Sequence, residues 1–125
     1  MLPAPLRMRS SADFALTIRR GARAGRPTLV VHCRLVADRP EPHVGFVVSK
    51  AVGGAVVRNQ VRRRLRGAVV EQRGSLPLGA DLVVRALPPA AAASYATLAE
   101  ELRTALAAAA RRAVPPASGA DTVHP

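Results

Sequence analysis

The sequence predicts a single domain built as an α+β or α/β sandwich, in which helices pack on one sheet. Apolar runs of strand length alternate with segments of helical periodicity, in the order helix, strands, helix, strand, helix. The 125 residues are a typical length for one domain, and 49% of them are hydrophobic. Trp is absent and only three residues are Phe or Tyr, so the core must be built from Ala, Val and Leu.

The first predicted helix lies within residues 10–21. Ser10 is a candidate N-cap, and Asp13 follows at the spacing of a capping box. Phe14 and Ile18 are four residues apart and therefore share one face. Gly21 is a typical helix stop.

Strands are predicted over residues 27–36, 44–50 and 80–87, with a weaker signal at 22–24. We expect the strands 27–36 and 44–50 to pair with each other. In the first of these, Leu29, Val31, Cys33 and Leu35 point one way and Val30, His32 and Arg34 the other. Residues Pro88 and Pro89 end the last strand.

Two further helices are predicted. One covers residues 55–73, and the other follows the N-cap candidate Ser94. The last helix carries an apolar stripe: Leu98, Leu102, Ala105, Leu106 and Ala109. The tail 114–125 is small, polar and rich in proline, so we expect a folded domain over 1–113 and a disordered tail over 114–125.

The net charge of +11 is concentrated in the first part of the chain. Residues 1–73 contain fifteen Lys or Arg and four Asp or Glu, whereas residues 74–125 contain four of each kind. Such an unbalanced basic surface repels itself unless a polyanion neutralises it. Nucleic acid is the polyanion that a small basic domain most often binds.

The predicted helix 55–73 separates this charge from its apolar residues. At 100° per residue, one side carries Arg58, Asn59, Arg62, Arg63 and Arg66, and the other carries Val57, Val61, Leu65 and Ala68. A surface evolved for solubility usually mixes both signs of charge. A row of guanidinium groups of one sign is suited to a line of phosphates.

Composition also excludes several classes of site. The single cysteine, Cys33, cannot form an internal disulfide or a thiolate-rich metal site, and we expect a reducing cytoplasm. No apolar run approaches the roughly 18 residues of a membrane span. The first residues lack the apolar region of a signal peptide.

The segment VGGAVVRNQVRRRLR, residues 52–66, resembles the signature of the protein subunit of bacterial ribonuclease P. The matching positions are Val52, Ala55, Arg58, Asn59, Gln60, Val61, Arg62, Arg63, Leu65 and Arg66. The segments DFALTIRRG, 13–21, and GFVVSK, 45–50, look like the first helix of that family and the strand before its signature. The resemblance covers about residues 6–112.

The resemblance implies an αβββαβα sandwich with a central mixed sheet and a left-handed crossover, the fold called ribosomal protein S5 domain 2-like. It also implies a non-catalytic protein in an endoribonuclease whose catalyst is RNA. That RNA subunit removes the 5′ leader of precursor tRNA with Mg²⁺. The sequence itself gives no defined metal site. The expected partners are the RNA subunit and precursor tRNA, with no membrane.

Residue by residue, the resemblance implies two binding surfaces. The RNA-binding set is Lys50, Arg58, Asn59, Arg62, Arg63 and Arg66. The cleft for the leader is lined by Phe14, Ile18, Val30 and His32, of which we expect Val30 and His32 to lie on a partly open face. Family members commonly carry aromatic residues at the positions of Ile18 and His32, so here leader binding would depend more on charge and less on stacking.

Three other functions are alternatives to this one. A ribosomal-type structural RNA-binding protein would share the basic helix. A protein-only nuclease would need His32, His43 and Lys50 to act as acid, base and phosphate clamp. Binding to a membrane surface would require bulky apolar residues that the basic helix lacks.

Overall fold

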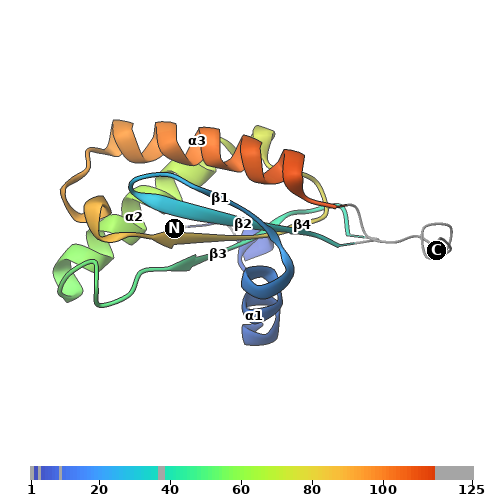
Figure 1. Ribbon diagram of the computed structural model, residues 1–125, viewed down its shortest axis with the longest axis horizontal. Coiled ribbons are helices and arrows are strands. Elements are labelled where there is room, and N and C mark those ends of the chain that lie inside the picture. The colour runs from blue at the N-terminus through green and yellow to red at the C-terminus, as the bar shows by residue number, and fades with distance from the viewer. Residues whose placement is uncertain (1, 3, 9, 37–38, 115–125) are drawn as a thin grey trace, which may run out of the picture.

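The computed structural model describes residues 2, 4–8, 10–36, 39–114 and shows a four-stranded sheet between two helical layers (Figure 1). Helices α2 and α3 pack on one face, and α1 crosses the other (Figure 1). The element order αβββαβα and the mixed sheet confirm the predicted α+β fold. The helices and strands are α1 Ser11–Arg20, β1 Ala22–Gly25, β2 Leu29–Leu35, β3 His43–Val47, α2 Ala55–Glu71, β4 Ala80–Ala86 and α3 Tyr95–Arg112. Most of the predicted tail, residues 115–125, lies outside the described residues.

The strand order is β1-β2-β4-β3. Strand β2 pairs antiparallel with β1 and β4, and β3 pairs parallel with β4. The prediction that β2 and β3 pair is therefore wrong, because β4 lies between them. Strand β4 is apolar on both faces over Leu82–Val84, a composition that suits the centre of a covered sheet. The chain leaves the sheet after β3, passes through α2 and returns as β4.

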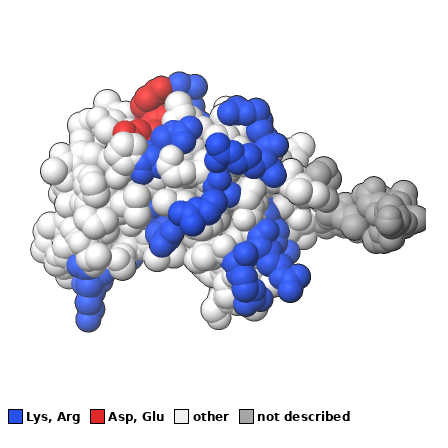
Figure 2. Space-filling model, in the orientation of Figure 1, with Lys and Arg blue, Asp and Glu red and all other residues white. Residues whose placement is uncertain are grey.

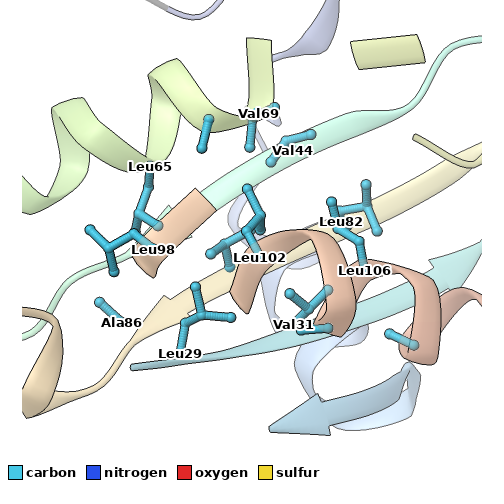
Figure 3. Close-up of a cluster of buried hydrophobic side chains, with 14 of the residues drawn as sticks. Leu29, Val31, Val44, Leu65, Val69, Leu82, Ala86, Leu98, Leu102 and Leu106 are labelled. Atoms are coloured by element: carbon cyan, nitrogen blue, oxygen red, sulfur yellow. The ribbon is translucent and has the colours of Figure 1, made fainter. Parts of the chain in front are cut away.

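The hydrophobic core lies between the sheet and the pair α2 and α3 (Figure 3). It is aliphatic, as the composition predicts. Side chains from both helices meet those of the strands there: Leu65 and Val69 from α2, Leu98, Leu102 and Leu106 from α3, and Leu29, Val31, Val44 and Leu82 from the sheet (Figure 3). This packing determines which side of α2 is left to face outward.

On the other face of the sheet, α1 is held by one close contact and two caps. A Cβ built on Gly45 would lie 2.2 Å from Cζ of Phe14, so the ring sits directly on the backbone of β3. The hydroxyl of Ser10 accepts a hydrogen bond from the amide of Asp13 at 3.3 Å, as the predicted cap requires. The amide of Gly21 donates to the Thr17 carbonyl at 2.9 Å and ends the helix.

A buried carboxylate joins three segments on the same face. Asp81 of β4 is fully buried and forms ion pairs with Arg34 of β2 and with Arg39 from the connection before β3. The Arg34 pair measures 2.8 Å, and Arg34 also lies 3.7 Å from Asp13 of α1. These two arginines are therefore compensated within the protein, in contrast to those of α2.

Candidate nucleic-acid interface

Helix α2 turns its apolar side into the core and its arginines outward. Val61, Leu65, Ala68 and Val69 are at most 1% exposed. Burial of each Val or Leu contributes about 1.5–3 kcal/mol, whereas each like-charged pair four residues apart costs only a few tenths. Apolar burial therefore holds the helix in place despite its charge. The side chains predicted to bind RNA, Arg58, Asn59, Arg62, Arg63 and Arg66, are exposed or half-buried on the opposite side.

The α2 arginines have no carboxylate partner among the described residues. Arg58 donates from Nε to the Gly53 carbonyl at 3.1 Å, and Arg62 donates to Oδ1 of Asn59 at 3.3 Å. Both acceptors are uncharged, so the positive charge is kept. The acid of this helix, Glu71, accepts a hydrogen bond from the Tyr95 hydroxyl instead, and this bond raises the pKa of Tyr95 to about 12.

Arg64 has a different environment from its neighbours. Its guanidinium donates to the carbonyl of Ala93 at 2.8 Å and so ties α2 to the 3₁₀ segment Pro88–Ala92 that precedes α3. On the helical wheel, Arg64 lies between the charged and apolar faces. Arg64 therefore stabilises the contact between α2 and this segment and is not part of the outward-facing row of arginines.

A hollow of about 650 Å³ lies along the arginine row. It is lined by Asn59, Arg62, Arg63, Arg66, Gly67 and Val70. Tyr95 stands beside it, since a Cβ on Gly67 would lie 3.6 Å from Cε1 of that ring. Lys50 and Arg58 lie outside this lining, and Lys50 is exposed in the turn before α2. No periodic signal in the sequence points to Gly67, Val70 or Tyr95.

A second hollow, of about 260 Å³, brings the basic helix together with Phe14, one of the residues predicted to line the leader cleft. Arg62 and Arg66 line it as well as the first hollow. They meet Phe14 there, together with Gly45 and with Arg7 of the N-terminal segment. That segment runs along β3, where the amide of Met8 donates to the Val44 carbonyl at 3.0 Å. Sequence periodicity does not reveal this placement, because it depends on a contact between distant segments.

The other predicted cleft residues are not equally accessible. Ile18 is 38% exposed and Phe14 is half-buried, but Val30 and His32 are only 4% and 2% exposed. The prediction of a partly open face for Val30 and His32 is therefore wrong, since α1 packs against β2 and β4 on this side. Burial, and then the nearby charges of Arg85 and Arg23, lowers the pKa of His32 below 6.5.

The groups required for a protein-only nuclease are dispersed. His32 lies on β2 and His43 on β3, and β4 separates those strands. The thiol of Cys33 is buried, and this burial raises its pKa to about 11. Within the part of the chain that the structure describes, no three His, Cys, Asp or Glu side chains are grouped to hold a metal ion. None of the described helices is both long and apolar enough to cross a membrane.

Comparison with known proteins agrees with the geometry. The family model described as Ribonuclease P matches residues 2–110. The ribonuclease P protein component of Kocuria rhizophila is 56% identical over 112 residues, covering 90% of this chain and 98% of that protein. The corresponding protein of Nocardioides is 59% identical over 109 residues, covering 85% of this chain and 92% of its own.

Solved structures show the same fold. The ribonuclease P protein of Staphylococcus aureus superposes with a TM-score of 0.76 at 26% identity, covering 83% of this chain and 94% of that one. The protein from Thermotoga maritima gives a TM-score of 0.72 at 27% identity, covering 80% of this chain and 94% of its own.

Proposed function

Because the chain belongs to the ribonuclease P protein family, we propose that its α2 surface and its α1 cleft are where it holds RNA. As the protein component of this endoribonuclease, it binds the RNA subunit and assists removal of the 5′ leader from precursor tRNA. The alternative function, that of a ribosomal-type structural protein, is not favoured by these relatives.

The RNA-binding surface is the row Lys50, Arg58, Asn59, Arg62, Arg63 and Arg66. This proposal rests on one observation: among the described residues, the α2 arginines have no carboxylate partner. Three of them, Arg62, Arg63 and Arg66, line the hollow of about 650 Å³. Guanidinium groups bind phosphate oxygens by paired, charge-assisted hydrogen bonds. Asn59 adds an amide that both donates and accepts, as recognition of a base edge or a 2′-hydroxyl requires.

The leader of precursor tRNA occupies the cleft on the α1 side. We place Phe14 and Ile18 on its accessible wall, and Val30 and His32 at its base, where α1 covers them. Arg62 and Arg66 line both the hollow beside Phe14 and the larger hollow. A single strand of RNA can therefore pass from one surface to the other and stay in contact with positively charged side chains.

The Mg²⁺ ions of the reaction act through the RNA subunit. A Mg²⁺ site requires oxygen ligands, usually carboxylates. Asp81 is occupied by two arginines and Glu101 accepts from the backbone amide and hydroxyl of Thr28, so these carboxylates do not fit such a site. The protein's role is to position RNA and to neutralise phosphates.

The folded domain comprises residues 1–113, with the segment 114–125 as a tail that the fold does not need. We place the protein in the cytoplasm, with no membrane involved. The tail contributes no apolar periodicity and no net positive charge to either surface.

Single substitutions in α2 test the RNA-binding surface. With Arg62→Ala or Arg66→Ala, we expect the protein to bind the RNA subunit, or precursor tRNA in the assembled enzyme, about 1 kcal/mol or more weakly, since a charge-assisted hydrogen bond contributes about 1.5–3 kcal/mol. Titration binding at moderate salt measures this change. Arg103→Ala is the matched control, because Arg103 is exposed on α3 and paired with Glu100. Equal affinities for all three variants would refute the assignment.

A further inference from the structure

We propose that Arg23, His32 and Arg85 form a phosphate-binding subsite at the floor of the α1 cleft, and that His32 takes up a proton when a phosphate of the leader binds there. The inference rests on the proposed function, since it assumes that the leader enters this cleft. To the proposed function it adds the group that is bound, a phosphate, the three side chains that bind it, and a dependence of leader affinity on pH.

The sheet register places the three side chains together. Arg23 of β1 lies directly opposite His32 of β2. Arg85 of β4 lies opposite Val30, two residues from His32 on the same face. Directly opposed side chains in an antiparallel pair have Cβ atoms about 5 Å apart, and diagonal neighbours are about 7–8 Å apart. Two long cationic side chains from adjacent strands therefore flank one imidazole.

Several buried polar atoms on this face lack a hydrogen-bond partner among the described residues. They are both ring nitrogens of His32, Nε of Arg34 and of Arg85, and the hydroxyl of Thr17 in α1. His32 is 2% exposed and Thr17 is fully buried. A buried polar group without a partner costs about 1–3 kcal/mol, so a cluster of them indicates a bound water or ligand group. A phosphate, whose oxygens accept hydrogen bonds, complements donors such as these.

The charges around His32 also favour an anion. The acids on this face are engaged elsewhere: Asp81 pairs with Arg34 and Arg39, and Asp13 lies near Arg34. Helix α1 adds Arg19 and Arg20 in its last turn. Arg23 and Arg85 form no ion pair within the described ranges. The charged groups that β1, β2, β4 and α1 carry around this part of the sheet are Arg23, Arg34, Asp81, Arg85, Asp13, Arg19 and Arg20.

Binding proceeds without unfolding any element. Arg23 is exposed on the edge strand, so its side chain can turn towards the ligand. Helix α1, which packs over β2 and β4, shifts from the sheet to admit the phosphate to the ring. One phosphate then accepts hydrogen bonds from the guanidinium groups of Arg23 and Arg85 and from an imidazole N–H. Its negative charge offsets the two cations that disfavour protonation of the ring. The protonated imidazolium supplies a third positive charge.

The sign of the pH dependence is set by linkage. In the free protein the pKa of His32 lies below 6.5, and the bound phosphate raises it. Leader affinity is therefore highest at low pH and decreases as the pH rises through the pKa of the bound state. The change should appear over about pH 5.5 to 8, the range in which histidine titrates.

The first test observes the ring directly. Imidazole resonances of the full-length protein are followed by NMR against pH, alone, with inorganic phosphate, and with a single-stranded RNA of leader length. We expect the His32 midpoint to move upward with the RNA, and Arg85→Ala to remove that movement. An unchanged His32 midpoint at saturating RNA would overturn the proposal. A shift with inorganic phosphate indicates a site for the phosphate group itself, and a shift with RNA alone indicates a site that requires the strand.

The second test uses the assembled enzyme and precursor tRNAs with a long or a one-nucleotide leader. We expect Arg23→Ala and Arg85→Ala to weaken binding of the long-leader substrate several-fold, with little effect on the short one. His32→Tyr should keep an aromatic floor but abolish the pH dependence. Arg103→Ala is again the control.

Each other outcome of this second test counts against a different part of the proposal. If affinity depends on leader length but none of these variants differs from the control, the phosphate subsite is wrong, whereas the assignment of the leader to the cleft is supported. If leader length has no effect on affinity, the cleft itself is wrong. If the variants weaken binding of the RNA subunit instead, the phosphate belongs to that RNA and the assignment to the leader is overturned.

Discussion

Gly45 and Phe14 determine how closely α1 approaches the sheet. The phenyl ring occupies the space that any side chain at position 45 would need, with 2.2 Å between an added Cβ and Cζ of Phe14. The same ring lines the hollow shared with Arg62 and Arg66. One glycine therefore controls both the packing of α1 and the shape of the cleft.

Gly45→Ala should destabilise the protein by about 1–3 kcal/mol, because the added methyl group must displace the ring or the helix. Urea denaturation monitored by circular dichroism measures the change. In a Phe14→Ala background the same substitution should cost about 1 kcal/mol less, since the obstacle is gone. Strict additivity of the two substitutions would show that the ring does not lie where the structure places it.

His32 makes the stability of the protein depend on pH. Its folded-state pKa lies below the ordinary value of 6.5, so the unfolded chain binds more protons at this position. The contribution of the neutral ring to the free energy of unfolding is fully present above about pH 6.5. It decreases as the pH falls towards the folded-state pKa of His32.

Thermal denaturation between about pH 5 and 7.5 should show the melting temperature falling on the acid side, and His32→Phe should flatten that part of the curve. The difference between the two curves isolates His32 from the other titrating groups. Parallel curves for the two proteins would contradict the burial of a neutral ring.

Helix α2 is the element in which stability and binding are separated by face. Leu65 is fully buried against α3 and the sheet, whereas Arg66 lines both hollows (Figure 3). A fold that depended on the arginines would lose stability whenever one of them was removed. The geometry instead assigns stability to one side and RNA contact to the other.

Leu65→Ala should cost about 2–5 kcal/mol of unfolding free energy, as large-to-small core substitutions do. Arg66→Ala should change that free energy by less than about 0.5 kcal/mol while weakening RNA binding. Parallel denaturation and binding measurements on both variants make the comparison. A large loss of stability in Arg66→Ala would mean that the outward side of α2 also holds the fold together.

Elements other than α2 also carry positive charge, such as Arg19 and Arg20 of α1 and Arg23 of β1. In Figure 2 basic groups spread across the face shown, and acidic groups occupy one small area of it. The +11 charge is therefore not confined to α2. A surface of this kind binds RNA through displacement of counterions, and the strength of binding then depends on the salt concentration.

The logarithm of RNA affinity should fall with the logarithm of salt concentration with a slope of about −3 or steeper. Each phosphate neutralised on a single strand contributes about −0.7, and the proposed α2 surface supplies several cations. Arg62→Ala should reduce the slope by about 0.7. A slope near zero would be incompatible with recognition by charge.

Local sequence determined the helices, most strand positions and the division of α2 into two sides. Capping at Ser10 and Ser94 and the spacing of Val61, Leu65 and Ala68 act over one or two turns, so they can be read without knowing the fold. The signature in residues 52–66 likewise indicated the family from adjacent positions alone.

Only the tertiary structure decided the placement of β4 between β2 and β3, the burial of His32, and the meeting of Arg62 and Arg66 with Phe14. Each of these depends on segments far apart in the chain. The alternation of residues in a strand predicts which side chains share a face. It does not predict which strand pairs with it or which element covers that face. Long-range pairing supplies that information, and no local pattern contains it.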